Sequence, residues 1–145
     1  MPLTRPLTIN DHSAVLPLYR VLGGAHTDPA AFNAILRHPG TTIWGSFDRA
    51  QLCAMVTLHV LPNLTQNATP YALIENVACL PNQQRRGHGR RAMMAAIDSA
   101  WASHAYKIML LTGQDTDAVG FYQTLGFRAD QKYGMQLRRV PPRTP

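Results

Sequence analysis

The sequence has 145 residues, of which 46% are hydrophobic, and a formal net charge of +6 at pH 7. These values favour one globular domain and exclude a membrane-spanning chain, because no apolar run approaches the length of a bilayer-crossing helix. The N-terminus lacks the apolar core of a secretory signal, and the two cysteines, Cys53 and Cys79, lie in separate apolar runs. We therefore expect a cytoplasmic protein with two free thiols. The basic balance indicates an anionic partner without identifying it.

The first forty residues predict one short strand, 3–7, and two helices. Four apolar side chains fall at helical spacing on the first helix: Val15, Leu18, Tyr19 and Leu22. The glycine pair after them ends this helix. Asp28 caps the second helix, Pro29 suits its first position, and the sequence HPG stops it.

After residue 40 the hydrophobic period changes to that of strands, and two later segments return to helical spacing. Strands are predicted at 41–47, 52–60, 71–80, 107–112 and 133–140. Helices are expected over 88–104 and from Ala118 to Leu125, with Gly126 as a stop and a frayed tail at 141–145. The order is β-α-α-β-β-β-α-β-α-β, a mixed α/β sheet. Segments 71–80 and 107–112 are joined by a helix, so they should be parallel neighbours, the second covered on both faces.

The stretch QQRRGHGRR, Gln83 to Arg91, places two glycines at the mouth of a predicted helix. A helix N-terminus attracts anions, and glycines remove the side chains that would keep a phosphate from its N–H groups. Neighbouring arginines can add charge. The alternative is a tight turn beside a solvated basic face.

Other phosphate and anion sites fit less well. No P-loop sequence is present, and GHGRRA fits the dinucleotide fingerprint only loosely, because PNQQRR separates it from the strand and no acid occurs at 107–112. Nucleic-acid modules favour aromatics beside their basic residues, and this stretch has none. No metal-ligand spacing occurs among the histidines and cysteines.

Gln84, Gly87 and Gly89 resemble the Q/R-x-x-G-x-G/A signature of the GNAT superfamily of acyl-CoA-dependent N-acetyltransferases. An alanine, an FY pair and a GF pair downstream also resemble that family, at Ala118, Phe121-Tyr122 and Gly126-Phe127. The resemblance implies a GNAT fold in which a splayed pair of parallel strands binds acetyl-CoA. It also implies a set of cofactor contacts: Val77, Ala78, Cys79, Gln84, Arg85, Arg86, Gly87, His88, Gly89, Arg90, Asp115 and Tyr122.

Asp115 stands where the family often has asparagine, and an aspartate accepts a hydrogen bond from the pantetheine amide without donating one back; helix capping is the alternative. His88 is expected to face solvent, where it is placed to meet a phosphate. A main-chain N–H near Val77 is expected to polarise the acetyl carbonyl. Cys79 lies in an apolar setting that raises its thiol pKa and argues against nucleophilic use.

Two residues are candidates for catalysis. Glu75 is the only glutamate and lies inside the apolar run ALIENVACL, where burial would raise its pKa toward that of a general base; the alternative is a structural pair with an arginine or an edge-exposed side chain. Asn76 should point to the opposite face. The resemblance implies that Tyr122 protonates the leaving thiolate, whereas its helical spacing also suits a core residue.

The sequence therefore predicts an N-acetyltransferase that moves an acetyl group from acetyl-CoA directly to a primary amine in a ternary complex. The acceptor is left open among small molecules, amino acids and peptides, and a homodimer also stays open. We expect no metal, no nucleic acid and no membrane as partners. The alternatives are a non-catalytic acyl-CoA sensor and a basic nucleic-acid-binding module.

Overall fold

The computed structural model describes residues 1–114 and 117–142. The chain forms two compact units, Met1–Leu110 and Leu111–Pro145, each with its own architecture. A single domain over 1–145 with a frayed tail stays a prediction. None of the helices in the described ranges combines the length and hydropathy required to cross a membrane.

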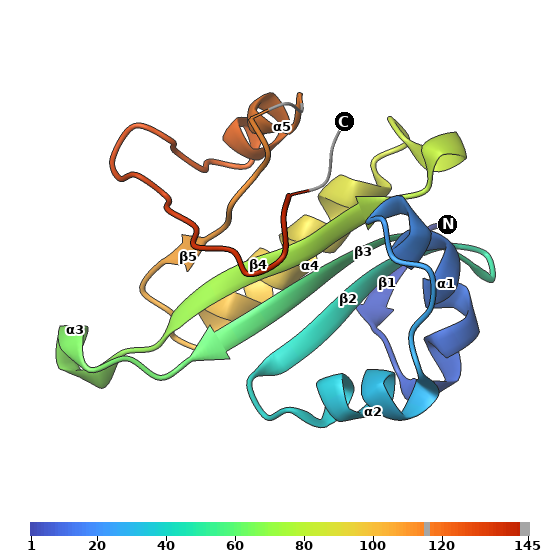
Figure 1. The fold of residues 1–145 in the computed structure, drawn as a ribbon, viewed down its shortest axis with the longest axis horizontal. Helices are drawn as coiled ribbons and strands as arrows, with labels where there is room; N and C mark the ends of the chain where they lie inside the picture. The colour runs from blue at the N-terminus through green and yellow to red at the C-terminus, as the bar shows by residue number, and fades with distance from the viewer. Residues whose placement is uncertain (115–116, 143–145) are drawn as a thin grey trace. The chain divides into compact units, whose positions relative to one another are not determined.

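The first unit is built on a mixed five-stranded sheet whose spatial order follows the chain (Figure 1). Its strands are β1 (Leu3–Pro6), β2 (Thr41–Asp48), β3 (Gln51–Leu61), β4 (Tyr71–Cys79) and β5 (Ile108–Met109). The first four pair antiparallel, whereas β4 and β5 are parallel. These pairings confirm the mixed sheet and the parallel neighbours across a helix, and they join β2 and β3 in a hairpin.

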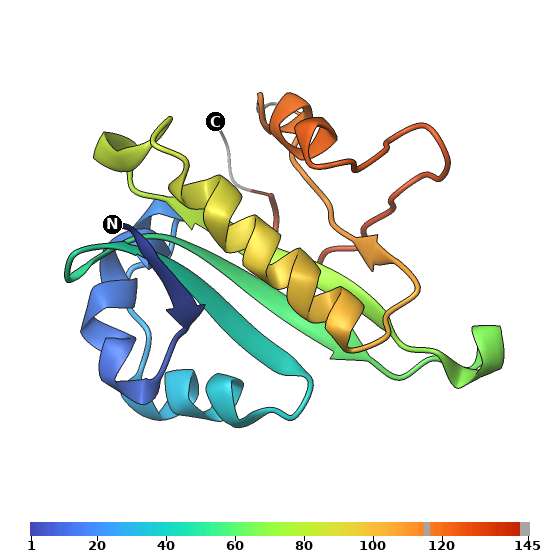
Figure 2. The same ribbon diagram turned by 180° about the vertical axis from the view of Figure 1, so that it is seen from behind.

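Helices cover both faces of this sheet. α1 (His12–Val21) and α2 (Pro29–Arg37) lie on one face, and α4 (His88–Ala102) lies on the other (Figures 1 and 2). Asp28 caps α2 as predicted, because its Oδ1 accepts a hydrogen bond of 3.0 Å from the N–H of Ala30. Short 3₁₀ turns occur at Ile9–Asp11 and Pro81–Gln83, and α3 (Thr65–Ala68) is a short turn between β3 and β4.

The main core lies between the sheet and the first two helices. It consists of Leu7, Val15, Leu18, Phe32, Ile43, Phe47, Leu52, Met55, Ala78 and Leu80. On the opposite face α4 buries a row of small side chains at every fourth position, Ala92, Ala96 and Ala100, beside Met93 and Ile97. Small side chains at this spacing let a helix approach a sheet closely, which fixes the height of its first turn over β2 and β3.

Two of the predicted strands are wrong in extent or existence. β5 has two residues in place of the six expected, and Met109 and Leu111 are 37% and 51% exposed, so this segment is not covered on both faces.

In the second unit α5 (Ala118–Thr124) forms and Gly126 follows with φ +97°, as predicted. Residues 133–140 form no strand, although apolar side chains alternate there. A strand needs an edge to pair with, and the described part of Leu111–Pro145 contains no other strand.

Both cysteines are free, as expected. Cys53 is fully buried and Cys79 is half-buried. Burial is the largest cause that raises the pKa of each thiol, so neither is a ready nucleophile.

Candidate functional site

The loop before α4 needs glycine at residue 87. Gly87 is the N-terminal cap of the helix and has φ +83°, a left-handed conformation that side chains disfavour. A Cβ at this position would lie 2.9 Å from Nη1 of Arg91. The helix begins at the next residue, so the N–H groups of His88 and Gly89 belong to its first turn, where no carbonyl of the same helix is available to them.

Gln84 and the arginines around this loop divide into two groups. Gln84, Arg85 and Arg86 are exposed, and so is Arg90 in the first turn of α4. Arg91 is half-buried and folds back, because its Nη2 donates a hydrogen bond of 3.0 Å to the carbonyl of Arg86. Arg91 therefore braces the loop from inside, while the other four residues line its outer surface. The sequence groups Arg91 with the neighbouring arginines that can add charge, and it does not indicate this inward contact.

The expectation that His88 faces solvent is wrong. Its side chain is 3% exposed, and its Nδ1 lies 2.9 Å from Oγ of Ser46 on β2. Burial, the repulsion of nearby Arg91 and then that of Arg86 lower its pKa, against an opposing effect of Asp48. His88 belongs to the row that continues as Ala92, Ala96 and Ala100, so the spacing of four already indicated an inward side chain. Only the main chain of His88 is left to meet an anion.

A bulge interrupts β4 at the candidate base. Two steps along β3, from Thr57 to Met55, match three steps along β4, from Glu75 to Ala78. Asn76 occupies the bulge with φ +54°. Glu75 and Asn76 are both exposed, so the expected burial of Glu75 is wrong. The bulge also breaks the regular alternation that was the ground for placing Asn76 on the opposite face. The apolar residues around Glu75 suggested a regular strand, whereas β4 contains one more residue than β3 over this stretch. A pattern of alternating side chains does not reveal such an insertion.

The outer edge of β4 is largely unpaired. β5 pairs with it only at Ala72 and Leu73, and beyond these residues no strand of the described chain takes the edge. Val77, Ala78 and Cys79 follow on this stretch, with side chains half-buried or buried. Main-chain groups that point away from β3 are therefore available along the segment that the sequence assigned to cofactor contacts.

The FY and GF pairs lie together within the second unit. The ring of Tyr122 is 5.2 Å from that of Phe121 and 6.1 Å from that of Phe127. The N–H of Phe127 donates to the carbonyl of Tyr122 at 3.1 Å, which closes the end of α5 around the tyrosine. Burial raises the pKa of the Tyr122 hydroxyl, so this group stays protonated at neutral pH. Asp115, the other predicted contact in this unit, lies outside the described residues.

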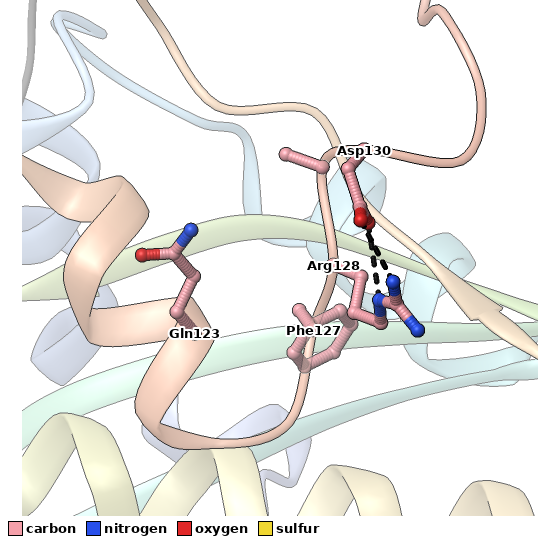
Figure 3. Close-up of a pocket in the computed structure, with 5 residues that line it drawn as sticks. Gln123, Phe127, Arg128 and Asp130 are labelled. Carbon is pink, nitrogen blue, oxygen red and sulfur yellow. Dashed lines mark hydrogen bonds and ion pairs between the residues drawn. The ribbon is translucent and has the colours of Figure 1, made fainter.

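A pocket of about 430 Å³ also lies in the second unit (Figure 3). Its walls are Gln123, Phe127, Arg128, Ala129 and Asp130. Two hydrogen bonds, of 3.0 and 2.7 Å, join the exposed pair Arg128 and Asp130. The pocket contains none of the predicted catalytic or cofactor residues, and we assign it no part in the site. Among the described residues, no group of three His, Cys, Asp or Glu side chains is placed to hold a metal ion.

The comparisons with known proteins agree with this architecture. The family model for the acetyltransferase (GNAT) family matches residues 11–127. No curated protein sequence matches the chain. A solved structure of a candidate acetyltransferase from Agrobacterium tumefaciens str. C58 is 38% identical, with a TM-score of 0.87 over 94% of this chain and 99% of that chain.

Two more distant structures show the same fold. An acetyltransferase from Trypanosoma brucei is 23% identical, with a TM-score of 0.85 over 95% of this chain and 99% of its own. Glucosamine-6-phosphate N-acetyltransferase from Arabidopsis thaliana is 15% identical, with a TM-score of 0.84 over 97% and 99%. The family model and the 38% identical structure establish that the chain belongs to the GNAT family of acetyltransferases.

Proposed function

We propose that the protein transfers an acetyl group from acetyl-CoA to a primary amine by direct attack within a ternary complex. The observation that carries the proposal is the left-handed, side-chain-free Gly87 at the mouth of α4, preceded in the chain by a β4 edge that is largely unpaired. A bare helix N-terminus suits a diphosphate, and an unpaired strand edge suits a ligand that carries amides. Coenzyme A has both parts.

Different residues of the protein would bind different parts of acetyl-CoA. The N–H groups of His88 and Gly89 would hold the diphosphate, and four exposed side chains would add polar and charged contacts: Gln84, Arg85, Arg86 and Arg90. The main chain of Val77, Ala78 and Cys79 would bind the pantetheine arm, to which Asp115 is also assigned. Bound acetyl-CoA supplies the thioester whose carbonyl carbon the amine attacks.

In the reaction the protein's own groups transfer protons and stabilise the developing negative charge. Glu75, exposed beside the bulge of β4, removes a proton from the acceptor ammonium, and the freed lone pair forms the new N–C bond. A main-chain N–H near Val77 stabilises the negative charge that develops on the carbonyl oxygen. The C–S bond breaks, and the hydroxyl of Tyr122, which its raised pKa keeps protonated, gives its proton to the departing sulfur. The second proton of the attacking nitrogen passes to the Tyr122 oxygen, which leaves a neutral amide and restores the hydroxyl.

The acceptor class includes small amines, amino acids and peptide N-termini. Glucosamine 6-phosphate, the substrate in the name of the Arabidopsis neighbour, is one probe. A free amino acid and a short unblocked peptide complete the set. Two free thiols favour the cytoplasm as the compartment.

Calorimetric titration with acetyl-CoA tests the donor site, with NADH and a short oligonucleotide as comparisons. We expect a micromolar Kd for acetyl-CoA, about −8 kcal/mol of binding free energy. Gly87→Val should weaken binding at least about tenfold, because the new side chain is strained at positive φ and meets Arg91. Gly120→Ala is the matched control, since a Cβ there meets nothing within 4 Å. Salt-sensitive oligonucleotide binding without acetyl-CoA binding would overturn the proposal.

A further inference from the structure

The hydroxyl of Thr41 lies between two imidazoles. Its Oγ1 is 2.9 Å from Nδ1 of His59 and 3.1 Å from Nδ1 of His38. Thr41 is buried at the start of β2, His59 is half-buried on β3, and His38 is exposed after α2. The three side chains therefore form a hydrogen-bonded chain that runs from the sheet to the surface.

The turn before β2 fixes this arrangement. The N–H of Thr41 donates to the carbonyl of His38 at 3.0 Å, and the N–H of Val60 donates to the carbonyl of Gly40 at 2.8 Å. A Cβ on Gly40 would collide with the carbonyl oxygen of Val60, so only glycine allows this approach. The resulting register places Thr41 directly opposite His59. The sequence HPG, which stops α2, thus also sets the hydroxyl between the two rings.

The direction of the hydrogen bonds follows from the single hydroxyl proton. When both rings are neutral, Thr41 donates to one Nδ1 and accepts from the other, so His38 and His59 must be opposite tautomers. Within the described chain, Nε2 of each ring has no hydrogen-bond partner. One Nε2 can therefore receive a proton at the inner end while the other releases one at the surface.

The hydrogen-bonded side chains of Thr41 and His59 lie on the face of the sheet that carries Glu75. Glu75 pairs with Thr57 on β3, and His59 is two residues further along the same strand, so both side chains point to one face. Diagonal neighbours of this kind are about 7–8 Å apart, within reach of long side chains. Thr41 shares this face, because it is the cross-strand partner of His59.

We propose that His38, Thr41 and His59 form a proton relay that carries the acceptor's proton from Glu75 to solvent during acetyl transfer. The inference rests on the proposed function. Nε2 of His59 takes the proton from the Glu75 carboxyl, and the Nδ1 proton of His59 moves to the oxygen of Thr41. The Thr41 hydroxyl proton passes to Nδ1 of His38, whose Nε2 proton leaves to water. One proton enters and one leaves, and the two rings exchange tautomers until proton exchange with water restores them.

The first test is independent of activity. Side-chain ¹H–¹⁵N correlation NMR at alkaline pH should find one of the two rings protonated at Nδ1 and the other at Nε2. Thr41→Val should remove the Nδ1–H tautomer, which free imidazole side chains disfavour. Two rings in the same tautomer in the wild-type protein would overturn the relay.

The second test is thiol release from acetyl-CoA with glucosamine 6-phosphate, a free amino acid and an unblocked peptide as acceptors. His59→Gln and Thr41→Val should lower kcat roughly 10- to 100-fold, less than loss of a base itself, because water partly replaces the relay. Their Kd for acetyl-CoA should stay at the wild-type value. Thr41→Ser keeps the hydroxyl and should keep kcat, and added imidazole should rescue His59→Ala.

His104→Asn is the matched control, because His104 is exposed beyond α4 and asparagine tolerates its positive φ. Wild-type kcat in His59→Gln, or a Thr41→Ser enzyme as slow as Thr41→Val, would overturn the relay alone. Wild-type protein that binds acetyl-CoA and releases no thiol with any acceptor would contradict both the transfer reaction and the relay. Failure to bind acetyl-CoA would overturn the proposed donor site first.

Discussion

Nδ1 of His88 lies 2.9 Å from Oγ of Ser46, and the two side chains are only 3% and 0% exposed. The contact joins the first turn of α4 to β2, across 42 positions of sequence. The imidazole points to the sheet, whereas the exposed Gly87 precedes it on the loop. The pair therefore sets the height and rotation at which the helix presents its first N–H groups.

Removal of the Ser46 hydroxyl should loosen this attachment. Ser46→Ala leaves a buried imidazole nitrogen without a partner, which costs about 1–3 kcal/mol of unfolding free energy. Urea unfolding measures this loss, and calorimetry should show weaker acetyl-CoA binding. Ser103→Ala, which removes an exposed hydroxyl at the other end of α4, should change stability by less than about 0.5 kcal/mol. Equal stability of the two variants would contradict the role of the pair.

Stability should depend on pH through His88. Burial first, and then Arg91 and Arg86, lower its folded-state pKa against the opposing charge of Asp48, whereas the unfolded chain titrates near about 6.5. As the pH falls through the unfolded value, the unfolded chain takes up a proton that the folded protein refuses, so stability falls. Between about pH 7.5 and 5.5 the wild type should lose more stability than His88→Gln. Parallel curves for the two proteins in that window would disprove the assignment.

The ion pair of Arg5 and Asp11 should matter for the N-terminal strand. Two hydrogen bonds of 2.8 and 2.9 Å join the groups, and the N–H of Thr8 donates to the same carboxylate at 2.7 Å. These bonds to Arg5 chiefly lower the pKa of Asp11, so its contribution is complete above the unfolded pKa and is lost as the pH falls through the folded value. Asp11→Asn should cost about 1.5–3 kcal/mol near neutral pH, measured by urea unfolding.

The second unit supplies the control for that ion pair. Arg128 and Asp130 make contacts of similar length, but their side chains are 62% and 66% exposed. Solvent screens such a pair, so Asp130→Asn should leave stability unchanged. A loss as large as that of Asp11→Asn would show that burial does not decide the value of these contacts.

Tyr122→Phe tests the proposed acid. If the hydroxyl protonates the departing sulfur, its removal should lower kcat by about 10²–10⁴-fold. The ring contacts with Phe121 and Phe127 remain, so folding and acetyl-CoA affinity should change little. Steady-state thiol release with calorimetry separates the two effects. Unchanged turnover would make Tyr122 a packing residue only.

Local sequence patterns predicted the local parts of the fold. Asp28 and Pro29 mark the start of α2 because capping and a fixed φ act within one turn of helix. The alternating apolar residues predicted β2, β3 and β4 to within a few positions. The segment 133–140 has the same kind of pattern but forms no strand, because a strand also needs a partner strand, which local sequence does not specify.

In the candidate site, too, the features that depend on local sequence were predictable, and those that depend on distant partners were not. Gly87 was predictable because the demand for positive φ is local. The bulge at Asn76 was not, since it depends on how β4 registers against β3. The roles of Ser46 and Thr41 were not predictable either, because each side chain makes a hydrogen bond with a histidine that is distant in sequence.

The strands lie in the sheet in the same order as in the sequence, and this order affects the sequence of folding events. β2, β3 and β4 follow one another in the chain and form an antiparallel meander through short connections, which close at low entropic cost, whereas β5 must return across the length of α4 to reach two pairing positions. We therefore expect the meander to form the folding nucleus and β5 to dock last. Hydrogen exchange should then be slowest in β3 and fastest in β5. β5, the neighbour of the β4 edge that we assign to the donor, would therefore be the last strand of the sheet to form and the first to open.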